Sequence, residues 1–208
     1  MRLDLAERLR CPRSHASTPL IVVADDVTGR DLRRGVAGCP VCQLEARIDA
    51  GDVWFGADRD DDHGEPADLE GALDRLIALC GLAEPGGAVL LTGRYGRLAE
   101  RLTVAAGVSV VLIHPRSPHV GTDEVSTVHG ERAQVPFIDQ TFRAAALDTG
   151  FPESFIADVA RSVQVGGRIV AAASVVPPEG VSELARDAAE WVGARERAAV
   201  VVELGRRK

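Results

Sequence analysis

The sequence lacks any long apolar run, and this absence bounds the class of protein. Of the 208 residues 46% are hydrophobic, but no run reaches the roughly 18 apolar residues that a membrane-spanning helix needs. The first ten residues alternate charged side chains with leucines and contain no apolar core of signal-peptide type. We therefore expect a cytoplasmic protein with one ordinary domain and a small additional module.

The sequence also lacks an excess of basic residues. Lys and Arg number 24 against 31 Asp and Glu, which gives a net charge of −7. Residues 1–50 hold 8 Arg and 7 acidic residues, whereas residues 51–70 hold 1 Arg and 8 acidic residues, so the acidity is concentrated in one short segment. Because no large part of the chain is strongly basic, the charge gives no indication of nucleic-acid binding.

Cysteine is scarce, and three of the four cysteines fall within the first 42 residues. They form two short segments, Cys11-Pro-Arg-Ser-His15 and Cys39-Pro-Val-Cys42, with 23 residues between them. In a cytosolic chain this clustering favours a metal over a disulfide. Tetrahedral zinc takes four nitrogen or sulfur ligands, commonly two from each of two tight turns. The spacing predicts one structural zinc ion held by Cys11, His15, Cys39 and Cys42.

Two alternatives to this zinc site stay open. The usual first turn is Cys-x-x-Cys, but Ser14 occupies the place of its second cysteine, so His15 is the natural substitute ligand. If His15 does not ligate, the module is a ribbon that has lost its metal. A redox role for Cys39 and Cys42 is the other alternative, although no helix obviously begins at Cys39 to lower its pKa.

The segments around these turns have the pattern of a small β-rich module. Strands are expected over 19–24, 34–38, 46–48 and 53–55. The pattern Leu9-Arg-Cys-Pro, Pro19-Leu20, Gly38-Cys-Pro-Val-Cys42 and Ile48-Asp-Ala-Gly-Asp-Val53 resembles the Trm112-like zinc-ribbon family. The resemblance implies a ribbon over 1–56, of a kind that occurs alone as a methyltransferase activator or fused in front of a methyltransferase domain.

Residues 57–66 are rich in aspartate and mark a change in composition. A carboxylate cluster with His63 is compatible with a divalent cation, but charges of one sign that repel each other are more typical of a solvated linker. We expect an acidic linker over 57–66 and a second domain over 67–208.

The second domain alternates strand-type and helix-type patterns. Strands are expected over 88–91, 108–113, 125–129, 142–147, 168–176 and 198–204, a turn over 165–167, and helices over 68–80, 98–105, 155–163 and 184–192. This alternation, with continuously apolar strands, predicts an α/β fold with a mainly parallel sheet and helices on both faces. Gly93 and Gly96 form a turn between the first strand and the next helix, where a ligand of such a sheet binds.

Two later segments resemble class I S-adenosylmethionine-dependent methyltransferases. Val128-His-Gly-Glu-Arg-Ala-Gln-Val-Pro-Phe-Ile-Asp-Gln-Thr-Phe142 is similar to that family's Gly-Asp-Ala…Leu-Pro-Phe-x-Asp-x-x-Phe-Asp segment. Val159-Ala-Arg-Ser-Val-Gln-Val-Gly-Gly-Arg-Ile169 is similar to its Arg-x-Leu-x-Pro-Gly-Gly-x-Leu segment. The resemblance implies a Rossmann-like methyltransferase fold, with S-adenosylmethionine as the cofactor that such a fold binds.

The resemblance also assigns site residues. Gly93 and Gly96 border the methionine part of the cofactor, His114 takes the position that binds the ribose, and Glu131 takes the place of the acid that contacts the adenine. Tyr95 in the glycine turn and Asp148 at a strand end lie at the same edge of the expected sheet and complete the predicted cofactor-binding set.

The predicted cofactor site departs from the family pattern, and this determines the expected function. The first strand ends in Leu91-Thr92 without an acidic residue, and His114 replaces a carboxylate that would accept two ribose hydroxyl protons. We expect weak or absent S-adenosylmethionine binding and a non-catalytic binding or regulatory role, with a protein partner or a homo-oligomer. The alternative is an active methyltransferase of unknown substrate. No general base or nucleophile is identifiable, but methyl transfer often needs only positioning.

Overall fold

The structure is a computed structural model that describes residues 1–56, 71–116, 122, 124–130 and 134–197. The linker expected over 57–66, the strand expected over 198–204 and Glu131 lie outside these residues. The N-terminal part contains α1 (Leu3–Ala6), β1 (Ile21–Thr28), β2 (Asp31–Gly38), β3 (Glu45–Asp49) and β4 (Asp52–Trp54). The remainder contains α2 (Ala72–Cys80), β5 (Ala88–Gly93), the 3-10 helix η1 (Arg94–Leu98), α3 (Ala99–Ala106), β6 (Ser109–Pro115), β7 (Val125–His129), β8 (Phe142–Leu147), α4 (Glu153–Ser162), β9 (Val163–Ala172), β10 (Val181–Arg186) and β11 (Glu190–Arg195).

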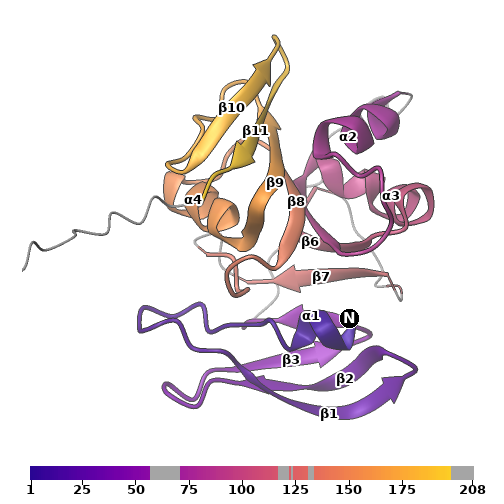
Figure 1. Cartoon of the computed structure of the whole chain (residues 1–208). Coiled ribbons are helices and arrows are strands. Elements are labelled where there is room, and N and C mark those ends of the chain that lie inside the picture. Colours follow the sequence, from indigo (N-terminus) through magenta and orange to yellow (C-terminus); the bar gives the residue numbers. More distant parts are fainter. Residues whose placement is uncertain (57–70, 117–121, 123, 131–133, 198–208) are drawn as a thin grey trace, which may run out of the picture.

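The described strands form one continuous sheet of eleven strands (Figure 1). Their order is β1-β2-β3-β4-β7-β6-β5-β8-β9-β11-β10. The strands β1 to β4, which we call the ribbon, pair with one another in antiparallel fashion. The strands expected in the N-terminal module are therefore confirmed. One face of the ribbon packs against the N-terminal helix and the segment near Phe137, with Ala37, Ala46 and Ile48 buried there.

The ribbon joins the larger part of the sheet through β4, which pairs in parallel with β7. Val53 lies beside Val128 and Trp54 beside His129 in this register. The buried carboxylate of Asp52 accepts a hydrogen bond from the backbone N–H of Thr127 over 2.6 Å. The two parts expected from the sequence therefore share one sheet, a connection that the sequence did not indicate.

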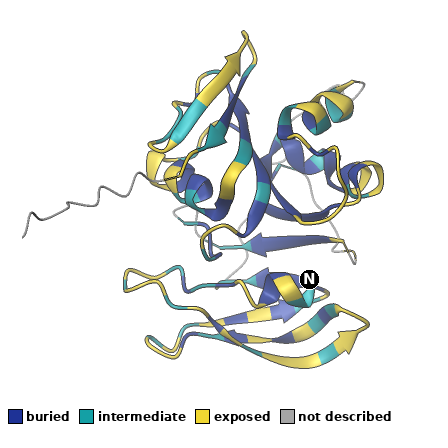
Figure 2. Cartoon of the chain, in the orientation of Figure 1, coloured by how far each residue is buried: buried dark blue, intermediate teal, exposed yellow. Residues whose placement is uncertain are grey.

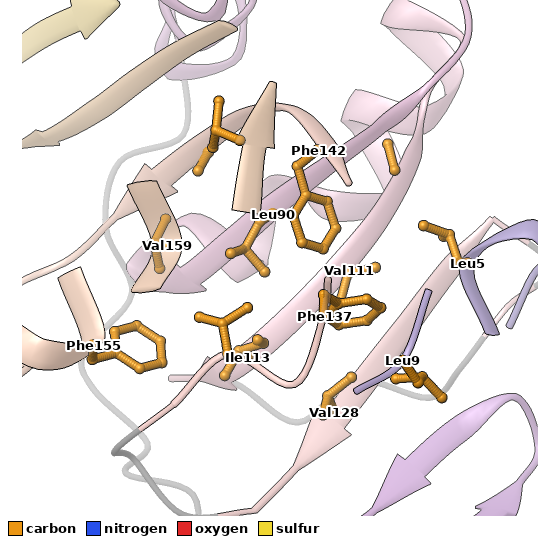
Figure 3. Close-up of a cluster of buried hydrophobic side chains, with 14 of the residues drawn as sticks. Leu5, Leu9, Leu90, Val111, Ile113, Val128, Phe137, Phe142, Phe155 and Val159 are labelled. Atoms are coloured by element: carbon orange, nitrogen blue, oxygen red, sulfur yellow. The ribbon is translucent and has the colours of Figure 1, made fainter. Parts of the chain in front are cut away.

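The five central strands β7, β6, β5, β8 and β9 are parallel, and helices cover both of their faces. On one face, Leu76 of α2 and Leu102 of α3 pack on the sheet. On the other, Phe155 and Val159 of α4 join a cluster that continues to Leu9 and the ribbon (Figure 3). The strands of this part are mostly buried except for the first half of β9, whereas β1 and β10 at the sheet edges are largely exposed (Figure 2).

Part of the expected fold is wrong. The sheet is mainly parallel in its centre, as expected for the second domain, but the β10–β11 hairpin at one end is antiparallel, and the antiparallel ribbon continues the same sheet at the other end, so that the sheet as a whole is mixed. The turn expected over 165–167 lies within β9, where the pairing with β8 shifts register.

The helix expected over 184–192 is absent, since these residues belong to the β10–β11 hairpin. The apolar spacing that suggested a helix is accidental: Leu184 is exposed, whereas Trp191 is buried and pairs with β9. The Asp187 side chain accepts hydrogen bonds from the backbone N–H groups of Ala189 and Glu190, which fixes the hairpin turn. Trp191 donates its ring N–H to the carbonyl of Val175 over 2.7 Å. Pairing in the sheet thus overrides local helical spacing.

Candidate metal centre and cofactor crevice

The four predicted metal ligands come together at one end of the ribbon. Cys11 and His15 come from the first turn, and Cys39 and Cys42 from the second, which follows β2. Their ligating atoms all lie within 4.8 Å of one another. The Cys11 and Cys42 sulfurs are 3.6 Å apart, and His15 Nε2 lies 3.1 Å from the Cys11 sulfur and 3.5 Å from the Cys39 sulfur.

This donor set fits a tetrahedral metal ion. Zinc–sulfur bonds of about 2.3 Å place two thiolates about 3.8 Å apart across a tetrahedron, close to the separations observed. His15 Nδ1 lies 2.8 Å from the carbonyl oxygen of Ala16 and must donate to it, because a carbonyl only accepts. That bond leaves the lone pair of Nε2 facing the sulfurs, the arrangement of a metal-bound imidazole.

The local electrostatics favour a thiolate at Cys39. Burial opposes ionisation, but hydrogen bonds from the backbone N–H groups of Cys42 and Val41 lower the pKa of Cys39 to about 6. Burial has the opposite effect on Cys11, whose pKa rises to about 11. Because thiolates are the species that bind metal, the second turn supplies a preformed anionic ligand.

The predicted cofactor crevice lies where the strand order reverses. β5 has β6 on one side and β8 on the other, so the carboxyl ends of β5 and β8 define the switch point at which ligands bind in such sheets. Gly93 ends β5 with a positive φ of 53°, and Asp148 follows β8 directly. The structure therefore brings Gly93, Gly96, His114 and Asp148 to one edge, as expected.

The side chain of Asp148 lies at this switch point, between the ends of β5 and β8. This side chain is 4% exposed. One carboxylate oxygen accepts the backbone N–H of Arg94 over 2.8 Å and lies 3.1 Å from the Arg116 guanidinium, and the other accepts the N–H of Thr149 over 2.8 Å. The amide at the start of η1, which would face an anionic ligand, is already bonded within the chain.

The two glycines of the turn serve this close packing. A side-chain carbon at Gly93 would collide with the Asp148 carboxylate, and one at Gly96 would lie 3.0 Å from the Pro115 ring. Both residues thus let the turn approach the neighbouring strand ends. The Asp148 carboxylate therefore packs directly against Gly93 in this arrangement.

Tyr95 and Arg94 face the β10–β11 hairpin. The Tyr95 hydroxyl donates to Glu190 over 2.5 Å, and Arg94 lies 3.1 Å from the same carboxylate oxygen. Arg75 of α2 binds the other oxygen over 2.9 Å. Burial raises the pKa of Tyr95 well above its usual range. Tyr95 thus anchors the turn to the hairpin, and its contact with a cofactor stays a prediction.

Sequence reasoning missed Glu190, the acceptor shared by Arg94, Tyr95 and Arg75. The residue was placed inside a helix that does not exist, and only the hairpin brings it opposite the glycine turn. The signal available was an acidic residue just before the apolar pair Trp191-Val192, which is typical of many surface segments.

His114 borders a cavity between the ribbon and the central strands. It is the residue before the last in β6 and adopts the left-handed region, with a φ of 50°, and its ring lies 6.1 Å from that of Phe151. The cavity has a volume of about 580 Å³. The described residues that line it are Pro12, Arg13, Ser14, Leu44, Glu45, Phe55, Gly56, Ile113, His114, Val128, Gly130, Gln134 and Pro136. A second cavity of about 500 Å³ includes Thr149, Phe151, Glu153 and Glu179.

No helix in the described part of the chain is long and apolar enough to cross a membrane. No protein-family model matches the sequence, and no curated protein matches it.

Solved structures of methyltransferases are similar to this chain. One is a candidate S-adenosyl-L-methionine-dependent methyltransferase of Methanococcus maripaludis, with 11% identity, a TM-score of 0.48, and coverage of 62% of this chain and 86% of that one. Another comes from the complex between the Haloferax volcanii Trm112 methyltransferase activator and a candidate methyltransferase, with 16% identity, a TM-score of 0.47, and coverage of 62% and 93%.

A third similar structure is geranyl diphosphate C-methyltransferase from Streptomyces coelicolor in complex with S-adenosyl-L-homocysteine. The identity is 18% and the TM-score 0.43, with coverage of 55% of this chain. The chain spans about half the length of that enzyme, 51%. These three solved structures are each described as methyltransferases or candidate methyltransferases.

Proposed function

We propose that this chain is a methyltransferase-like binding protein, stabilised by one zinc ion, that does not bind S-adenosylmethionine tightly and acts through a protein partner. The observation that carries the proposal is the Asp148 carboxylate in front of Gly93, held by Arg94, Thr149 and Arg116. The four convergent cysteine and histidine side chains are the observation that supports a bound zinc ion. We assign this ion a structural role, because it would connect the two turns of the ribbon.

The energetics support weak cofactor binding. To enter the crevice, the methionine part would have to displace a buried carboxylate with three charge-assisted or backbone hydrogen bonds. Bonds of this kind contribute about 1.5–3 kcal/mol each when a charged group takes part. At the ribose position, His114 has at most one acceptor nitrogen and cannot accept both hydroxyl protons as a carboxylate does. Together these losses are worth two orders of magnitude or more in affinity.

Calorimetric titration with S-adenosylmethionine tests the proposal. We expect no measurable binding to the wild type and a gain of affinity in Asp148→Ala, in which the space in front of Gly93 is free. Asp139→Ala is the matched control, since this exposed carboxylate pairs with Arg161 away from the crevice. Tight binding to the wild type would contradict the proposal.

The second candidate function is an active S-adenosylmethionine-dependent methyltransferase. The cavity of about 580 Å³ beside His114 and Gly130 favours it, because small-molecule sites are typically about 300–1,000 Å³ in volume. Under this alternative Asp148 swings out of the crevice when the cofactor enters, and the wild type binds S-adenosylmethionine in the low micromolar range in the same titration.

A further inference from the structure

Exposed large apolar side chains are concentrated on the ribbon. Ile21, Val23 and Val27 of β1 are 60%, 59% and 43% exposed, Val36 of β2 is 36% exposed, and Val41 in the second turn is 63% exposed. These five are the majority of the nine exposed large apolar residues in the described part of the chain. A contiguous apolar patch on a soluble protein marks an interaction site more often than scattered single residues do.

The strand register gathers part of this set on one face. Val23 lies beside Val36, Val36 beside Arg47, and Arg47 beside Trp54. Neighbouring residues in register share a face of a sheet, and Ile21 shares it with Val23 by alternation. We call Ile21, Val23, Val36, Arg47 and Trp54 the ribbon face. Val36 and Arg47 alternate along their strands with the buried Ala37, Ala46 and Ile48, so the ribbon face lies on the opposite side of these strands.

Arg47 and Trp54 stack at one end of the ribbon face. The Arg47 guanidinium lies over the Trp54 ring at 5.6 Å, and the Trp54 ring stacks on His129 with 3.6 Å between centroids and an interplanar angle of 5°. Trp and Arg are the side chains that most often dominate binding energy at protein interfaces. Since the stack spans β3, β4 and β7, a partner on this face contacts both the ribbon and the central sheet.

The charges around the ribbon face favour a second copy of the same chain as its partner. Residues 1–50 are nearly neutral, with 8 Arg and 7 acidic residues, in a chain of net charge −7. Arg34 and Arg47 alternate with Asp26 and Asp49 across the face, as ion pairs at 3.7 Å and 3.2 Å. A two-fold axis brings the same patch of each copy together, so a face that carries both signs can complement itself.

The outer edge of β1 fits a partner less well than the face does. The pairing of β1 with β2 shifts register around Ala24 and Asp26, which marks a β-bulge, and two successive acidic residues, Asp25 and Asp26, lie there. Bulges and charges of this kind are devices that prevent strands from pairing edge to edge. We propose that two copies of this chain associate face to face through the ribbon face, with Val23 and Val36 at the centre of the contact.

Analytical ultracentrifugation of the full metal-loaded chain tests this proposal. We expect a dimer for the wild type and a monomer for Val23→Glu combined with Val36→Glu, with the dimer dissociation constant raised at least about 100-fold because charges at the centre of an interface are left unpaired. The control is Val104→Glu on α3, which is 87% exposed and should leave the mass unchanged.

Metal content and thermal unfolding of the double variant show that it is folded. A monomeric wild type would overturn the proposal and leave the ribbon face to a different protein. A dimer that persists in the folded double variant would also overturn it, because the contact would then lie elsewhere, for example at the β1 edge. A variant with a single substitution, Val36→Glu, provides the same comparison if the double variant does not fold.

Discussion

The metal centre and the cofactor crevice are two clusters of polar side chains with opposite arrangements. In the ribbon, four ligating atoms within 4.8 Å point at one another and share a common centre. At the crevice, Asp148 is bonded to Arg94, Thr149 and Arg116, so the groups satisfy one another. The first arrangement can hold a cation, whereas in the second the groups are already bonded to one another. A cluster of polar groups therefore indicates a binding site only if these groups are not already bonded to one another.

The largest expected effect is in the metal centre. Cys42→Ser should abolish binding of one zinc ion per chain and unfold the ribbon, with a loss of at least about 5 kcal/mol, because the apparent binding free energy of structural zinc sites in small modules is about 10–16 kcal/mol. Elemental analysis together with thermal unfolding measures both effects. Ser14→Ala, in the same turn, should retain its zinc. A wild type that is folded without metal would contradict the assignment.

The contact between β4 and β7, where the ribbon joins the central strands, gives the next largest effect on stability. Burial raises the pKa of Asp52 to about 6, against the hydrogen bond from Thr127, from an ordinary value of 3.8. The folded state therefore holds this proton more tightly than the unfolded state, and stability falls as the pH rises from about 4 to about 6. The shift of about 2 units corresponds to about 3 kcal/mol at pH 7.

Asp52→Asn isolates that contribution. The amide oxygen still accepts from Thr127 and carries no charge, so the variant should gain stability relative to the wild type as the pH rises from 4 to 6, and the gain should be constant above it. Urea unfolding at a series of pH values measures the difference. A difference that does not change with pH would show that Asp52 is not the titrating group.

The contacts of Glu190 between the glycine turn and the hairpin give a smaller effect on stability. Glu190→Gln removes the charge that pairs with Arg94 and Arg75 and should cost about 2 kcal/mol, because these partners are partly exposed and screened. Chemical denaturation checks this value. Glu183→Gln, which breaks an exposed pair with Arg186, should have little effect. Equal losses in both variants would mean that Glu190 is an ordinary surface residue.

The metal ligands could be predicted from the sequence because spacing alone specifies them. Each of the two tight turns supplies two of the four ligands Cys11, His15, Cys39 and Cys42. The central strands could also be predicted from the sequence, since strands that are buried along almost their whole length, such as 109–115, have a distinct apolar pattern.

The contacts that close the crevice could not be predicted in this way. Asp148 meets Gly93 only because β8 pairs with β5, and Glu190 meets Tyr95 only because the β10–β11 hairpin turns back over the sheet. Both contacts join residues more than 50 positions apart. The pairing of β4 with β7 could not be predicted from the sequence for the same reason, because a parallel pairing leaves no local signal in either strand.

The most direct test of this account is the calorimetric titration of the wild type and Asp148→Ala with S-adenosylmethionine. The account predicts a dissociation constant for the wild type above about 100 µM, two orders of magnitude weaker than a micromolar ligand, and a gain of at least about tenfold in Asp148→Ala, with Asp139→Ala unchanged. A wild type that binds with a low micromolar dissociation constant would show that Asp148 leaves the crevice readily, and it would favour an active methyltransferase.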